Sequence, residues 1–254
     1  MAYGTRSYAQ NYSNFGGTPQ AVKWLLIVNI GVFVLNFIAV QAGAGAFFNH
    51  FALVPAAVVH FFAIWQLFTY MFLHDPYGFT HILFNMLTLY MFGVDLERRW
   101  GSKRFLQFYF TCGVGAGICV VLANLLFGNM NGRTIGASGA IYGLLMAFGM
   151  LYPDRTLLFS FLFPIKAKYF VMILGAIAFL SSISASDSGV SHVAHLGGMI
   201  FGYIYLRSYS PSNFDLGAYL RFQYKEWKLQ RAKRKFQVYM KKQNDRPSRG
   251  PWVN

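Results

Sequence analysis

Long uncharged apolar runs alternate with short polar segments along most of this chain. Runs of about 20 apolar residues are typical of helices that cross a lipid bilayer. We predict six such helices, at residues 22–41, 78–95, 104–127, 137–152, 168–184 and 190–207. A further apolar stretch at 47–72 is broken by Pro55 and carries several polar side chains, among them His50, His60 and Gln66. We expect this stretch to be an amphipathic loop lying in the membrane interface.

The predicted fold is an all-α membrane protein, a bundle of six transmembrane helices with an amphipathic first outer loop. Composition agrees, since 56% of the residues are hydrophobic and only 12% are charged, against about 25% charged in soluble domains. Three regions follow: a flexible cytoplasmic N-terminal tail at 1–21, the six-helix domain at 22–207, and a basic, partly amphipathic cytoplasmic tail at 208–254.

The positive charges are distributed very unevenly. Twelve of the 22 Lys and Arg residues lie between Arg207 and Arg249, after the last apolar run. If the N-terminus is cytoplasmic, the six spans leave only Arg133 in an outer loop, which is the asymmetry of the positive-inside rule. The net charge of +14 therefore indicates a tail on anionic lipid, with no nucleic acid as partner. The N-terminus resembles neither a secretory signal nor a transit peptide, which favours a bacterial inner membrane.

Four polar side chains in the predicted spans fall at one depth. A helix rises about 1.5 Å per residue, which places Ser138 roughly 9 Å below the outer boundary of the hydrocarbon core. The same arithmetic puts His195 and His81 at similar depths, and Asn85 lies one turn from His81 on the same helix face. Polar groups inside a membrane are costly, so this coincidence indicates a functional site.

A serine beside a neutral imidazole is a candidate nucleophile with its general base. His81, Asn85 and the backbone amide of Ser138 are candidate donors to an oxyanion. Taken alone, Ser138 between glycines is also typical of helix packing, and His195 of a hydrogen bond to a neighbour.

The glycines around these residues form two small-xxx-small motifs, which allow helices to approach closely. The motifs are Gly139 with Gly143, and Gly198 with Gly202. We expect them to pack the fourth predicted helix against the sixth and so to bring Ser138 and His195 together.

Other intramembrane chemistries are excluded by residues the chain lacks. No Asp or Glu occurs between Glu97 and Asp154, so a Ser-His dyad is expected instead of a triad with an acid. No His is followed by Glu, which excludes the His-Glu-x-x-His zinc motif. No predicted span carries a central Asp, and we expect neither a metal nor a cofactor.

These motifs together resemble the rhomboid family of intramembrane serine proteases. The residues that carry the resemblance are Gly136-Ala137-Ser138-Gly139 with Tyr142, His81-Ile82-Leu83-Phe84-Asn85, Ala194-His195 with Gly198 and Gly202, and the turn from Gly93 to Gly101 with Glu97. The resemblance covers about residues 22–207. It departs at Trp65-Gln66, where bacterial members often have Trp-Arg, which puts the usual anchoring of the first outer loop in question.

The resemblance implies a protease that cleaves the transmembrane segments of other membrane proteins. It implies Ser138 as nucleophile, His195 as base and Tyr142 packed on the His195 ring, with His81, Asn85 and Gly136 supporting the oxyanion. Two alternatives stay open: a non-catalytic rhomboid-like protein that binds clients, and a small transporter whose polar residues line a path.

Overall fold

The computed structural model describes residues 17–127, 130–159, 163–183 and 192–209, together with single residues and short pieces between 224 and 237. Most of the expected N-terminal tail and of the basic tail lies outside the described residues. By its contacts the chain divides into two units, 1–206 and 207–254, and the site lies in the first.

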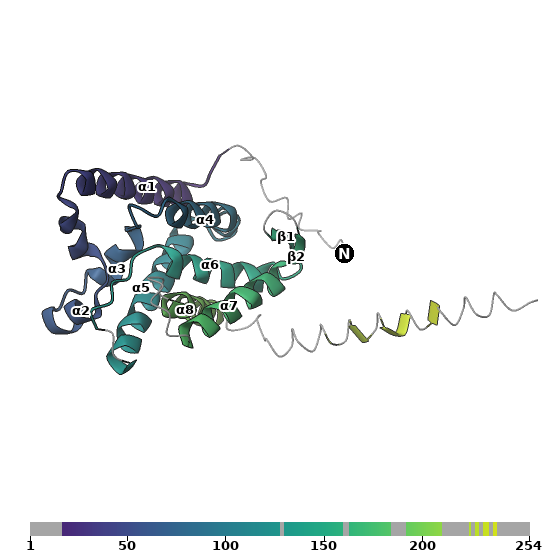
Figure 1. Ribbon diagram of the computed structural model, residues 1–254. Helices are drawn as coiled ribbons and strands as arrows, with labels where there is room; N and C mark the ends of the chain where they lie inside the picture. Colours follow the sequence, from purple (N-terminus) through teal and green to yellow (C-terminus); the bar gives the residue numbers. More distant parts are fainter. Residues whose placement is uncertain are drawn as a thin grey trace, which may run out of the picture. The chain divides into compact units, whose positions relative to one another are not determined.

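Helices make up most of the first unit (Figure 1). In chain order the elements are α1 (Gln20–Gln41), η1 (Gly45–Phe51), α2 (Pro55–Phe61), α3 (Gln66–Thr69), η2 (Tyr70–Phe72), α4 (Phe79–Trp100), α5 (Ser102–Phe127), α6 (Ser138–Leu151), β1 (Thr156–Phe159), β2 (Phe163–Lys166), α7 (Ala167–Ile183) and α8 (His192–Tyr209). A helix occupies the described part of each of the six predicted segments. Three of them, α1, α4 and α5, are long and apolar enough to cross a membrane, and α6 and α7 are shorter apolar helices.

The segment at 47–72 forms short helices, as expected for a loop that does not span. Pro55 is the first residue of α2, where its missing N–H costs no hydrogen bond. The side chain of Gln66 is buried and joins this segment together, since its Oε1 accepts from Val54 N and its Nε2 donates to the His50 carbonyl. Trp65 also donates to that carbonyl. Trp65-Gln66 thus anchors the first loop despite its departure from Trp-Arg.

The prediction that the fold is all-α was wrong at one place. Strands β1 and β2 form a two-stranded antiparallel hairpin between α6 and α7, with Thr156 opposite Lys166. Pro164 cannot donate a backbone hydrogen bond, which disfavours a helix but suits a short edge strand. Lys166 and Lys168 both bind Asp154 at the base of the hairpin, and these bonds hold the pKa of that carboxyl below its usual value.

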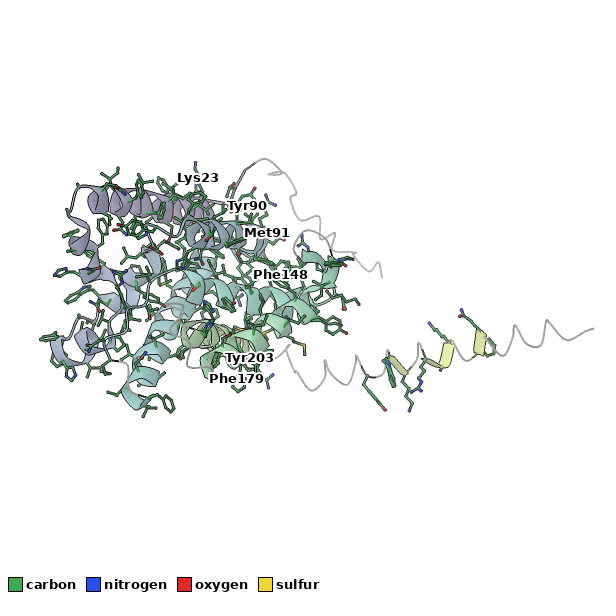
Figure 2. All side chains as sticks on the ribbon, in the orientation of Figure 1. Lys23, Tyr90, Met91, Phe148, Phe179 and Tyr203 are labelled. Atoms are coloured by element: carbon green, nitrogen blue, oxygen red, sulfur yellow. The ribbon has the colours of Figure 1, made fainter. Side chains whose placement is uncertain are left out.

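The first helix exposes most of its large apolar side chains and buries two asparagines, unlike a helix in a soluble protein. Trp24, Leu35 and Ile38 are each more than half exposed, whereas Asn29 and Asn36 are buried. Large exposed apolar side chains also cover other helices, including the labelled Tyr90, Met91 and Phe179, while Phe148 is buried (Figure 2). Such a surface is suited to lipid.

Helix α6 is the central element of this unit. It contacts α4, α5 and α7, and α1 packs along α4 at the edge (Figure 1). At the far end of α4, the buried carboxylate of Glu97 accepts hydrogen bonds from the first amides of α1, Ala21 N at 2.9 Å and Val22 N at 2.8 Å. Ser102 Oγ donates to the same carboxylate at 2.6 Å. A negative charge here also suits the positive end of the α1 dipole.

We predict that Glu97→Gln lowers the free energy of unfolding by about 2 kcal/mol, because it weakens charge-assisted bonds to buried amides. The measurement is denaturant unfolding in detergent micelles. Asp95→Asn on the same helix is the control, since Asp95 only forms a partly exposed ion pair with Arg155 and should cost less than about 1 kcal/mol. Equal losses in the two variants would contradict the role given to Glu97.

Candidate active site

Ser138 and His195 form a hydrogen-bonded pair between α6 and α8. The Ser138 Oγ lies 2.9 Å from His195 Nε2, although the residues are 57 positions apart. Neither α6 nor α8 contains an Asp or Glu, and His195 is 7% exposed. When the imidazole proton is on Nδ1, Ser138 donates to Nε2, which is the geometry of a hydroxyl poised for deprotonation.

Two neighbouring rings hold the imidazole of His195. Tyr142, one turn after Ser138 on α6, stacks on it with ring centroids 4.1 Å apart and planes 3° from parallel. His192, one turn earlier on α8, meets it edge to face at 5.9 Å. Stacking on one face and an edge contact from its own helix restrict the rotation of the ring. The sequence offered only the resemblance as a sign of Tyr142, and His192 was missed.

The glycines make the pairing possible because they remove side chains from the contact between α6 and α8. A Cβ built on Gly198 would stand 1.8 Å from the Gly139 carbonyl oxygen. One turn further along, a Cβ on Gly202 would stand 3.2 Å from atoms of the Gly143 backbone. The helices therefore touch backbone to backbone at the level of the pair.

Ser138 is the first residue of α6, and a tight turn at Gly136 precedes it. Gly136 has φ +120°, a conformation that side chains rarely adopt, and its amide donates to the Tyr70 carbonyl at 2.9 Å. A Cβ on Gly136 would stand 2.9 Å from His81 Nε2, so the imidazole of His81 lies directly against the turn. The first amides of α6 lack helical acceptors, as at the start of any α-helix.

Of the predicted oxyanion donors, His81 lies beside the turn, whereas Asn85 is directed elsewhere. Its Nδ2 donates to the carbonyl of His81, four residues earlier on the same helix, at 2.9 Å. The structure thus does not direct this amide at Ser138. A rotation of its side chain would be needed for it to reach an oxyanion.

The loop before Ser138 is fastened to the first outer segment. Leu53 and Thr134 exchange backbone hydrogen bonds at 3.0 and 2.9 Å, and Ala56 N donates to the Met130 carbonyl. Arg133, the cation predicted for the outer loops, donates to the side chain of Asn49. Residues 130–136 are therefore held by elements that precede them by more than 60 positions.

A pocket of about 230 Å³ lies next to the turn. Its walls include Arg133 and Ile135 from the loop that leads to Gly136, and His74 from the segment before α4. The ring of His74 is fully buried and its centroid lies 5.2 Å from that of His81. His74 was not among the residues predicted for the site. A histidine close to a predicted span was the signal that could have found it.

Metal ligation has no support in the described part of the chain. No group of three or more His, Cys, Asp or Glu side chains there could hold a metal ion. Cys112 is buried and Cys119 is half-buried, and neither forms a disulfide. The described site is a serine hydroxyl hydrogen-bonded to an imidazole within an apolar bundle.

We predict that Gly198→Ala lowers the free energy of unfolding by more than about 3 kcal/mol, because its methyl group would overlap the α6 backbone and overpacking is relieved only by moving a helix. Gly31→Ala is the control, since a Cβ on Gly31 would meet nothing within 4 Å. The control should be neutral or slightly stabilising. Thermal unfolding in micelles compares the two, and a tolerated Gly198→Ala would contradict the close contact.

We predict that His74 makes the protein less stable in acid. Burial, together with the nearby His81, lowers the pKa of His74 from 6.5 to about 3. The unfolded state then binds more protons than the folded state between these values, so the free energy of unfolding falls as the pH drops from 6.5 toward 3. Replacing the exposed His60 by Phe should leave this slope unchanged, whereas His74→Phe should flatten it. Denaturant unfolding at several pH values is the measurement, and an unaltered slope in His74→Phe would refute the assignment.

Known proteins are similar to this chain over the part that carries Ser138 and His195. The family model described as the Rhomboid domain matches residues 62–212, more than half of the chain. RHOMBOID-like protein 1 of Arabidopsis thaliana is 36% identical over 60% of this chain and 36% of its own length. Rhomboid protease GluP of Bacillus subtilis is 35% identical over 55% of this chain and 25% of its own length. Each match spans less than two thirds of the relative.

Proposed function

Because the chain belongs to the rhomboid family, we propose that it is an intramembrane serine endopeptidase that cleaves the transmembrane segments of other proteins. The observation that carries this proposal is the 2.9 Å contact between Ser138 Oγ and His195 Nε2. The two helices that supply these atoms carry no acidic residue. A serine that is hydrogen-bonded to a histidine inside an apolar bundle supports nucleophilic catalysis better than helix packing alone.

The reaction proceeds in two halves. Ser138 Oγ attacks the scissile carbonyl carbon while His195 Nε2 takes the hydroxyl proton. The tetrahedral intermediate collapses, the peptide C–N bond breaks, and His195 gives the proton to the leaving amine. Water then attacks the ester on Ser138 with His195 again as base, which releases a carboxylic acid and restores the hydroxyl.

The negative oxygen of each intermediate needs donors that are fixed in advance. The amides at the start of α6, including that of Ser138, are suited to this because they belong to the positive end of the helix. His81, which lies against Gly136, is a second donor. Asn85 joins them when its side chain leaves the His81 carbonyl that it now binds.

We further propose the topology that the charges favour. Helices α1, α4, α5, α6, α7 and α8 cross the membrane, both termini are cytoplasmic, and the membrane is the inner membrane of a bacterium. The site then lies near the outer face. The twelve cations from Arg207 to Arg249 rest on anionic lipid, where each contributes on the order of 1 kcal/mol.

Substrates must offer an unwound backbone, because a helix keeps its carbonyl groups in internal hydrogen bonds. Transmembrane segments with Gly, Pro and small residues near their outer ends meet this need. The pocket beside Arg133, Ile135 and His74 adjoins the turn that carries Ser138. It offers space for a side chain of the extended substrate.

We predict that Ser138→Ala and His195→Ala each abolish cleavage, because nucleophile and base act as one unit. Purified protein in liposomes is incubated with a labelled transmembrane substrate, and the products are separated by mass. Labelling of Ser138 by a fluorophosphonate should be lost in the same variants.

His60→Ala serves as the matched control for His195→Ala, since His60 is exposed on α2 and its loss should leave cleavage unchanged. Undiminished cleavage by Ser138→Ala would overturn the proposal. Binding of membrane proteins without cleavage or labelling would point to the client-binding alternative, and solute flux across the liposomes would point to a transporter.

A further inference from the structure

Tyr70 contacts three segments near Ser138: its own first outer segment, α5 and the turn before α6. It begins η2 and is 1% exposed. Its backbone carbonyl accepts the hydrogen bond from Gly136 N, at 2.9 Å. Its hydroxyl donates to the Gly113 carbonyl of α5, at 2.7 Å. One residue therefore connects the first outer segment, α5 and the turn that leads to the serine.

The hydroxyl of Tyr70 also adjoins the contact between α6 and α8. A Cβ built on Gly139 would stand 3.2 Å from the Tyr70 hydroxyl oxygen and 3.5 Å from the Ala194 carbonyl oxygen. Gly139 directly follows Ser138 and Ala194 directly precedes His195. The phenol thus lies beside Gly139, the residue that follows Ser138, while the backbone of Tyr70 fixes the preceding turn.

We propose that Tyr70 is a positioning residue for Ser138. Its hydroxyl bond to Gly113 fixes Tyr70 against α5, and its carbonyl in turn fixes the Gly136 amide. Gly136 adopts φ +120°, a conformation that needs external restraint because glycine has many alternatives. The restraint holds the first residue of α6 where its hydroxyl meets His195. This inference rests on the proposed protease function only for its kinetic readout.

Tyr70 acts here as a hydrogen-bond donor and takes no part in proton transfer. Burial, with a smaller contribution from the nearby Tyr109, raises the pKa of Tyr70 well above its usual value of 10.0. The phenol stays protonated, and therefore keeps its bond to Gly113, over the whole range in which a protease would be assayed. Its effect on rate should thus be the same at every pH.

The test compares Tyr70→Phe with Tyr109→Phe. Tyr109 is also fully buried, and its hydroxyl has no hydrogen-bond partner within the described part of the protein. We expect Tyr70→Phe to lower kcat and the rate of fluorophosphonate labelling by roughly ten-fold, the worth of about one hydrogen bond. KM should stay within about two-fold, and the rate ratio to wild type should be constant from pH 6 to pH 9. Tyr109→Phe should match wild type in all of these.

Hydrogen–deuterium exchange gives a second readout that does not depend on catalysis. Peptides that cover residues 133–138 should exchange faster in Tyr70→Phe than in Tyr109→Phe or wild type, because the Gly136 amide loses protection. Unchanged exchange would overturn the positioning role even if the chain proved not to be a protease. Cleavage that depends on Ser138 in wild type and persists in full in Tyr70→Phe would overturn it while leaving the proposed function intact.

Two further outcomes would also count against the proposal. A Tyr70→Phe protein that fails to fold, or that loses activity only in proportion to its lowered unfolding temperature, would make Tyr70 a stability residue. A rate ratio that changes with pH would make it a participant in proton transfer.

Discussion

The contact between α6 and α8 is the constraint on which the site depends. The backbones approach so closely that a Cβ on Gly198 would reach within 1.8 Å of the Gly139 carbonyl oxygen. Ser138 is the neighbour of Gly139, and His195 lies one turn before Gly198, so the helix separation sets the distance between hydroxyl and imidazole. Lipid provides no hydrophobic drive for helix association, and packing must supply it instead. The glycines that stabilise the bundle are therefore also the ones that assemble the dyad.

Ser138 is positioned from outside its own helix. Backbone hydrogen bonds tie residues 130–136 to residues 53, 56 and 70 of the first outer segment. That segment exposes large apolar side chains, among them Phe61, Phe62 and Ile64. An apolar surface of this kind is suited to the bilayer interface. The lipid-facing part of the fold and the turn before Ser138 thus form one connected structure, held mostly by main-chain groups that most substitutions leave in place.

Local patterns predicted the helices and the proximity of Ser138 to His195, because both follow from the composition of the chain. Long uncharged runs mark the helices. Few polar residues occur within these runs, so counting residues from the end of each helix was enough to place Ser138, His195 and His81 at a similar depth. The hairpin at 156–166 was not predicted, because a short apolar run is equally compatible with a strand and with the end of a helix. The bond from Tyr70 to Gly113 and the cap of Glu97 on α1 link residues 43 and 76 positions apart. Such long-range contacts depend on how the helices pack against one another, and the hydrophobic pattern along the chain does not predict that packing.

Neither α6 nor α8 carries an acid that could meet His195, and this has a physical explanation in this setting. Burying a carboxylate in an apolar bundle has a large desolvation cost, and a single imidazole partner offsets only a small part of it. The usual task of that acid is to hold the imidazole in the correct orientation. Here the ring of Tyr142, parallel to within 3° at 4.1 Å, and the edge of His192 supply that restraint by ring packing. Aromatic rings cost far less free energy to bury than a carboxylate does, so a membrane interior favours a histidine oriented by rings over one oriented by charge.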